Sequence, residues 1–137
     1  MGFHVTVERT DDGGYIARNG RGAEIRFGTS EGTDFTPVEL LLAALGGCNI
    51  VTVEPLTAQR GHRLTRLAAD LTAEKLKPNT LGTITMTYDV VLPEGDAEAE
   101  PVFRAVAERV HEKYCTVSTA LREQTTVDVE IPETLPS

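Results

Sequence analysis

Short alternating stretches of apolar and polar residues fill the first thirty positions of the chain. Residues 4–9, 15–18 and 23–27 each alternate, and turns containing Asp-Gly and Asn-Gly separate them. A period of two is typical of half-buried strands, because successive strand side chains point to opposite faces. We therefore expect three short strands, followed by a loop rich in Gly, Ser and Thr at residues 28–34.

A continuous apolar stretch then predicts a long helix from Pro37 to about Arg60. Thr36 suits the N-cap, Pro37 suits the first helical position, and Glu39 completes a Thr-x-x-Glu capping box. Gly61 is a typical C-terminal stop. The leucines and small residues after Glu39 leave no polar face, so we expect burial over most of the helix circumference.

Two interruptions flank Cys48, one of only two cysteines in the chain. Gly46 and Gly47 lower the helix propensity just before the thiol, and they predict a close crossing with another helix. Pro55 removes one backbone hydrogen bond and predicts a kink. The thiol should therefore lie partway along a buried helix that is locally irregular.

The second half of the chain mixes both periods. Residues 64–73 fit helical spacing and alternation alike, and propensity favours a helix there. Residues 83–92 alternate strongly and predict a strand. A helix should begin near Pro101, with one or two further helical turns at residues 116–121. Residues 125–131 alternate and predict a closing strand, after which a loose tail follows.

Composition indicates one domain of ordinary globular type. The chain has 137 residues, 40% of them hydrophobic and 25% charged, which allows a single core. The formal net charge of -8 argues against a nucleic-acid partner, since a phosphate backbone attracts clustered Lys and Arg. No signal peptide is recognisable, and Gly46, Asn49 and Glu54 interrupt the longest apolar run. We therefore expect a cytoplasmic protein without a membrane partner.

Cys48 and Cys115 are too few to form a disulfide scaffold in a chain of this length. In a reducing compartment they are either inert small hydrophobes or reactive thiols. An ordinary cysteine is only about 3% thiolate at pH 7, so a reactive one needs a nearby cation, base or helix N-terminus. Cys48 lies about three turns into its helix, where the dipole is weak. Arg18, Arg21 and Arg26 in the strand region are the candidate cations.

Glu39 precedes Cys48 by nine residues, which places it about 13 Å away along a regular helix and on the opposite face. It therefore cannot contact the thiol of its own chain in that geometry. A twofold dimer with antiparallel long helices would bring it toward Cys48 of the other chain, so a Glu39 contribution predicts an interchain site. Helix capping alone is the alternative role.

A zinc site is another alternative for the thiols. His111 and Cys115 are four residues apart, and Cys48 and His62 would complete a set of four ligands. No Cys-x-x-Cys or His-x-x-x-His pair supports such a site, so the sequence favours a protein without a bound metal.

Two motifs resemble the OsmC/Ohr superfamily. The sequence PVELLLAALGGC, which ends at Cys48, is similar to the central helix of that family, and residues 114–118 are similar to its second cysteine segment. The cysteines also occur in the family's order, 67 residues apart. Arg26, followed by a Gly-Thr loop, resembles the arginine-bearing loop of the OsmC branch. The resemblance spans residues 3–131.

This resemblance implies an α+β fold in which antiparallel sheets pack around the cysteine-bearing helix of an intertwined homodimer. By the same resemblance, residues 63–76 should form a strand, against their propensity. The implied organisation is a single domain over residues 1–137, with strands and a loop in 1–35, the central helix in 36–61, strands and helices in 62–131, and a loose tail in 132–137.

The resemblance also implies thiol-dependent reduction of organic hydroperoxides. Cys48 would be the peroxidatic thiol, and Cys115 would be the resolving thiol that closes a disulfide after Cys48 is oxidised. Arg26 would stabilise the Cys48 thiolate and orient the peroxide. An external dithiol of the lipoyl type would reduce the disulfide, so no bound cofactor is expected.

Val38 is a departure from the family pattern. Peroxidases of the family carry an arginine-pairing glutamate ten residues before the first cysteine, where this chain has Val38. Glu39, one position later, matches another family glutamate and is included among the candidate catalytic residues. The departure favours the alternative function of a ligand-binding or structural OsmC-like dimer with vestigial thiols.

Overall fold

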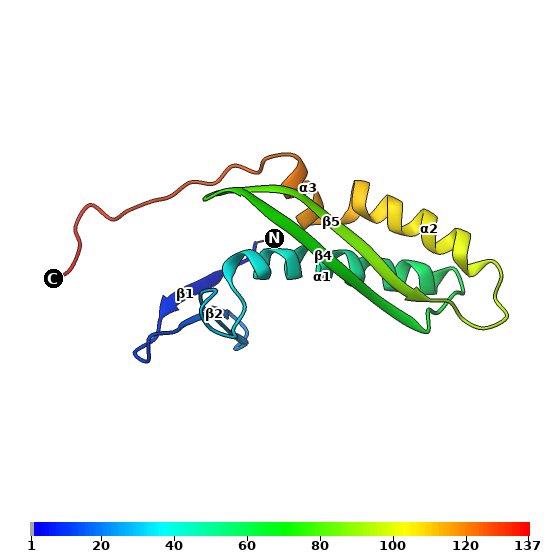
Figure 1. The fold of residues 1–137 in the computed structure, drawn as a ribbon, viewed down its shortest axis with the longest axis horizontal. Helices are drawn as coiled ribbons and strands as arrows, with labels where there is room; N and C mark the ends of the chain where they lie inside the picture. The colour runs from blue at the N-terminus through cyan, green and yellow to red at the C-terminus, as the bar shows by residue number, and fades with distance from the viewer. Residues whose placement is uncertain (1) are drawn as a thin grey trace. The chain divides into compact units, whose positions relative to one another are not determined.

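Three short strands come first in the chain, and a long helix, two long strands and shorter helical segments follow (Figure 1). The computed structural model describes residues 2–137. This order of elements confirms the predicted α+β class. The elements are β1 Val5–Arg9, β2 Tyr15–Asn19, β3 Glu24–Phe27, α1 Pro37–Gln59, β4 Arg66–Lys77, β5 Thr80–Val91, α2 Ala99–Arg109, the π-helical turn η1 Val110–Tyr114 and α3 Thr116–Arg122.

Contacts within the chain divide it into two compact units. The strand unit contains residues 2–47 together with residues 69–88. The thiol unit contains residues 48–68 and 89–137. Helix α1 and the paired strands β4 and β5 each contribute residues to both units.

An antiparallel sheet in the order β1-β2-β3 begins the strand unit and confirms the three predicted strands. The register aligns Val7, Ala17 and Ile25 across the strands, so these apolar side chains share one face. Val7 and Ile25 are 59% and 54% exposed. The other face carries buried Ile16, with Arg26 as its register partner. Within residues 2–137, one apolar face of this sheet is therefore largely uncovered.

Helix α1 begins with the predicted capping box. The Glu39 backbone N–H donates to Thr36 Oγ1 at 3.2 Å, and the Thr36 backbone N–H donates to the Glu39 carboxylate at 2.8 Å. The helix continues through Pro55 and ends at Gln59, and Gly61 follows with a φ of 87°. Glycine adopts this left-handed conformation without steric cost, which is why the helix ends there.

Gly46 permits close packing, but its near neighbour is a strand and not the helix that the sequence predicted. A Cβ atom at Gly46 would lie 2.5 Å from Leu71 Cδ1 of β4, whereas a Cβ atom at Gly47 would meet nothing within 4 Å. The side chain of Leu71 thus occupies the space that a larger residue at position 46 would need.

The strand β4 shows that the helix favoured by propensity is wrong and that the strand expected from the family resemblance is correct. It pairs with β5, and beside the pair the Thr65 N–H donates to the Val91 carbonyl at 2.9 Å. Half-buried and exposed residues alternate along much of both strands. Local propensity gives the wrong answer because β5, which pairs with this backbone, lies outside the sequence window that propensity considers.

Helices α2 and α3 confirm the predicted helical region of the thiol unit. α2 buries Val106, and Val110 immediately after it is fully buried. The turn η1 joins α2 to Cys115, whose N–H donates to the Val110 carbonyl at 2.7 Å. π-Helical turns are rare and occur frequently at functional sites. This turn leads directly to the second cysteine.

Residues 125–131 form no strand, so the predicted closing strand is wrong for the single chain. Val127 and Val129 are 82% and 83% exposed. The alternation of apolar and polar residues here is typical of a strand, but a strand forms only when a neighbouring strand pairs with its backbone. No described residue of the chain supplies that neighbour.

Helix α1 is long and apolar enough, by length and composition alone, to cross a membrane, contrary to the expectation from its interruptions. Those interruptions are mostly uncharged, and Glu39 and Glu54 are the only charged residues of the helix. One such helix is weak evidence of a membrane protein, because the core helix of a soluble protein passes the same test. Only 28% of its most apolar window is buried within the chain, which leaves apolar surface for another element to cover.

Candidate functional site

The thiol unit brings the two cysteines together although they are 67 positions apart in the sequence. Cys48 lies midway along α1 and is half-buried, whereas Cys115 directly precedes α3 and is fully buried. Both are free thiols, and their side chains are hydrogen-bonding neighbours. The structure thus places side by side the two residues that the sequence singled out.

Cys115 is the N-cap residue of α3. Its backbone is extended, with φ -79° and ψ 110°, and its Sγ accepts from the Ser118 backbone N–H at 3.3 Å. Side-chain acceptors are common at this position because the first N–H groups of a helix have no partner within the helix. An N–H group directed at the sulfur favours its negative thiolate form.

Asn49, the residue after Cys48, is buried and directs its amide at the second cysteine. Its Nδ2 donates to Cys115 Sγ at 3.4 Å and to Ser118 Oγ at 3.2 Å. His111 Nδ1 lies 3.1 Å from Ser118 Oγ, so the hydroxyl links the imidazole to this group. The sequence analysis did not identify Asn49 or Ser118 as site residues. Asn49 could have been found, because an asparagine beside a thiol in an apolar helix is unusual enough to indicate a polar site.

The two thiols have opposite pKa shifts. Burial raises the pKa of Cys48, and the interaction with Cys115 adds to this increase, which the Val117 backbone only partly offsets. Burial also acts to raise the pKa of Cys115, but hydrogen bonds from the Ser118 side chain, from Cys48 and from backbone N–H groups lower this pKa overall. Within a single chain, Cys115 is therefore the thiol that ionises first.

Arg26 and Arg18 form ion pairs on the surface of the strand unit. Arg26 Nη1 lies 3.7 Å from the Asp12 carboxylate, and Arg18 pairs with Glu8 and Glu24. These side chains are exposed, so water and salt screen the pairs and each contributes little. The action of Arg26 on a thiol stays a prediction.

Glu39 performs the capping role that the sequence gave as its alternative. Its hydrogen bonds with the Thr36 backbone and side chain lower the pKa of Glu39 and keep the carboxylate ionised. Its contribution to a site in another chain stays a prediction. Val38, at the position of the family glutamate, lines a cavity of the strand unit together with Tyr15 and Phe27.

No group of three His, Cys, Asp or Glu side chains suited to a metal ion occurs among residues 2–137. His62 Nδ1 lies 2.5 Å from the Asp96 carboxylate, and His111 is engaged with Ser118. The zinc alternative requires both histidines together at the thiols, so these residues give it no geometric support.

The long helix, the antiparallel sheet and the thiol pair define a class of α+β proteins in which a central helix carries one of two neighbouring cysteines. A family model described as OsmC-like protein matches residues 29–130. The chain belongs to the OsmC-like protein family, which confirms the resemblance of its two cysteine motifs.

Individual proteins agree with this assignment. An uncharacterized protein of Mycobacterium tuberculosis is 32% identical over 128 residues, which cover 91% of this chain and 93% of the relative. An OsmC-like protein from Mycoplasma pneumoniae has a TM-score of 0.70 at 17% identity, with 90% of this chain and 89% of that chain covered. The organic hydroperoxide resistance protein OhrB of Bacillus subtilis has a TM-score of 0.57 at 18% identity, with 90% and 93% covered. The two structural likenesses establish the fold alone.

Proposed function

We propose that this chain is a cysteine-based reductase of organic hydroperoxides. Membership of the OsmC/Ohr superfamily indicates a peroxidase-related function. The observation that carries the proposal is the adjacent pair of free thiols, Cys48 and Cys115, in which the second is supplied with hydrogen-bond donors. The name of the Bacillus subtilis OhrB protein agrees with an organic hydroperoxide as the substrate.

In the first step, Cys48 is the peroxidatic residue because it is the more exposed of the two thiols. Its thiolate attacks the terminal oxygen of the hydroperoxide, so that an S–O bond forms and the O–O bond breaks. The departing alkoxide takes up a proton and leaves as the alcohol. The peroxide gains two electrons, and Cys48 becomes a sulfenic acid.

In the second step, the Cys115 thiolate attacks the Cys48 sulfur. The S–S bond forms, the S–O bond breaks, and hydroxide leaves as water after it is protonated. The amide of Asn49 and the backbone N–H of Ser118 favour this thiolate before the reaction starts. Resolution should therefore be fast at neutral pH, which protects Cys48 from further oxidation.

In the third step, an external dithiol, of the lipoyl type by family resemblance, attacks the disulfide and returns both protein thiols while it becomes a disulfide itself. The electrons come from this dithiol, so the cycle requires no bound cofactor. A cytoplasmic location agrees with the cycle, because the reducing pool there keeps thiols reduced.

We also propose that the active form is a homodimer in which Arg26 and Glu39 act at Cys48 of the other chain. The uncovered apolar face that includes Val7 and Ile25 supports this assembly, as does the unpaired strand pattern at residues 125–131. A cation is needed because burial raises the pKa of Cys48 within one chain.

The alternative function is a ligand-binding or structural OsmC-like dimer without catalysis. Two observations favour it, namely Val38 at the position of the family glutamate and the raised pKa of Cys48. Both would leave the Cys48 thiol protonated at neutral pH, so that it would react slowly with a peroxide.

Thiol counting separates the two functions. The reduced protein is treated with about one equivalent of cumene hydroperoxide, and its free thiols are titrated after denaturation. The parent should lose both thiols, Cys48→Ser should lose none, and Cys115→Ser should lose one and react with a sulfenic-acid probe. Unchanged thiols in the parent would exclude the peroxidase, and oxidation of Cys115 in Cys48→Ser would reverse the assigned roles.

A further inference from the structure

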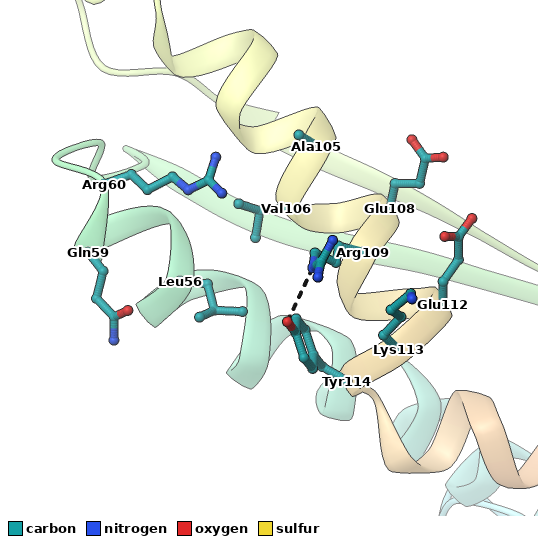
Figure 2. Close-up of a pocket in the computed structure, with 10 residues that line it drawn as sticks. All are labelled: Leu56, Gln59, Arg60, Ala105, Val106, Glu108, Arg109, Glu112, Lys113 and Tyr114. Carbon is teal, nitrogen blue, oxygen red and sulfur yellow. Dashed lines mark hydrogen bonds between the residues drawn. The ribbon is translucent and has the colours of Figure 1, made fainter.

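A cavity of about 530 Å³ lies in the thiol unit between the end of α1, α2 and η1 (Figure 2). This volume is within the range of about 300 to 1,000 Å³ that is usual for small-molecule sites. Leu56 lines it from α1 and Arg60 from the turn just after α1. Val106 and Arg109 line it from α2, and Lys113 and Tyr114 from η1. Neither cysteine lines this cavity, so the cavity is a different site from the thiol pair.

Three cations line this cavity in a protein whose net charge is -8. Arg60 and Lys113 form no ion pair with any residue in the described part of the chain. Glu108 and Glu112 are also lining residues, but Figure 2 shows their carboxylates directed away from α1. The same view shows the Arg60 side chain extending from the turn after α1 toward Val106. The space between the helices is therefore positively biased.

Arg109 is held in place by its neighbour in η1. Its Nε donates to the Tyr114 hydroxyl at 3.2 Å, and its guanidinium lies 5.7 Å from the centre of the Tyr114 ring. The hydrogen bond from Arg109 lowers the pKa of Tyr114. Because only Nε takes part in this bond, the planar guanidinium presents its terminal nitrogens to an incoming anion.

The remaining wall of the cavity is apolar. Leu56 and Val106 face each other across the space between α1 and α2 in Figure 2, and the Tyr114 ring lies beside them. A ligand that binds both the cationic side chains and the apolar wall needs one anionic end and an apolar body.

We propose that this cavity binds a small amphipathic monocarboxylate. Its carboxylate lies between Arg60 and Arg109, and its apolar body lies against Leu56, Val106 and the Tyr114 ring. Arginine pairs with carboxylates in a forked geometry, which gives the site its orientation. The apolar wall supplies affinity through the area that the ligand removes from water.

Octanoate and octanamide are suitable probes, because they share an apolar body and differ in charge. Each is titrated into the reduced full-length protein at low salt and followed by calorimetry and by NMR shifts. Octanoate should bind at least about tenfold more tightly than octanamide, with shifts at the cavity residues. Equal affinities, shifts elsewhere, or no octanoate binding at about 10 mM would overturn the proposal.

Variants locate the binding site. Arg60→Gln and Arg109→Gln should each weaken octanoate binding about tenfold and leave octanamide binding unchanged. Arg104→Gln is the matched control, because Arg104 is on α2, pairs with Glu100 and does not line the cavity. All three arginines are exposed, so the variants should fold, which circular dichroism checks. An Arg104 effect as large as the other two would also overturn the proposal, since the cause would then be overall charge.

Discussion

The strand unit and the thiol unit differ in how completely each buries an interior of its own. The largest side chains of the thiol unit that are almost completely inaccessible to water are Asn49, Val53, Thr57, Val110, Cys115 and Ser118. In the strand unit, the buried apolar side chains are Ile16 and Leu45, while Val7 and Ile25 remain more than half exposed. The thiol unit thus has a fully buried interior, although Val51, Val127 and Val129 on its surface are exposed, whereas the strand unit presents an apolar sheet face.

This difference suits the two units to different roles, namely holding the thiol pair and forming an interface. Buried polar groups need partners, and in the thiol unit Asn49, Ser118 and Cys115 supply them to one another. The exposed sheet face of the strand unit instead has the properties of an interface, because large apolar patches on monomers mark interaction sites. The comparison indicates that the thiol pair and its hydrogen bonds are formed within the chain, whereas the N-terminal sheet is available for assembly with a second chain.

A charge on the exposed face is the strongest test of this division. Val7→Lys should weaken the proposed dimer at least about 100-fold, because it places an unpaired charge in an apolar interface. Light scattering over a concentration series measures the change. Thr6→Lys, on the opposite face of β1, is the control and should leave the dimer intact. A parent protein that is monomeric at all concentrations would exclude the interface.

The interior of the thiol unit should be more sensitive than its surface. Val53→Ala removes two methyl groups from a fully buried position and should cost about 2 kcal/mol in the free energy of unfolding. Val51→Ala, at a position that is 69% exposed on the same helix, should change it by less than about 0.5 kcal/mol. Urea denaturation compares the two. Equal costs would mean that another chain covers Val51 in solution.

Asn49→Ala should slow disulfide formation about tenfold at neutral pH, because the Cys115 thiolate loses a hydrogen-bond donor and its pKa rises. Since the thiolate fraction falls with decreasing pH, the defect should be largest at acidic pH and disappear above the raised pKa. Stopped-flow measurement of the sulfenic acid's decay gives this profile. Thr116→Ala, at an exposed position beside the thiol, is the control. A defect of equal size at every pH would indicate a structural effect.

The smallest expected effect is at the start of α1. Thr36→Ala removes the side chain that accepts from the Glu39 N–H and should cost about 1 kcal/mol in the free energy of unfolding. Thermal denaturation measures it, with the exposed Thr33→Ala as the control. Peroxide-dependent thiol loss should be unchanged, since the backbone N–H of residue 36, which donates to the Glu39 carboxylate, is kept in the variant. A loss of activity at unchanged stability would instead connect the cap with the reaction.

Several parts of the fold were predictable because their causes are local. The capping box of Thr36 and Glu39 and the stop at Gly61 depend on neighbouring residues, so the bounds of α1 were correct. The alternation of apolar and polar residues in β5 was also sufficient to predict that strand. The helix favoured for β4 by propensity and the strand expected at residues 125–131 were wrong, because pairing partners decide both.

The candidate site was predictable only in part. Cys48 and Cys115 were identified from their motifs, and the structure places them together. Asn49 and Ser118 were missed, and His111 was considered only as a zinc ligand, because these residues are up to 69 positions apart and meet only through packing.

The sequence by itself determined the family, the cysteine pair and the central helix, because each can be identified from one or two short motifs. Only the tertiary structure decided which thiol receives hydrogen bonds, which helix faces enclose the cationic cavity, and which sheet face stays uncovered. The physical reason is that burial and hydrogen-bond geometry depend on contacts between distant segments. The pKa of each thiol depends on those distant contacts as well as on the backbone N–H groups near it.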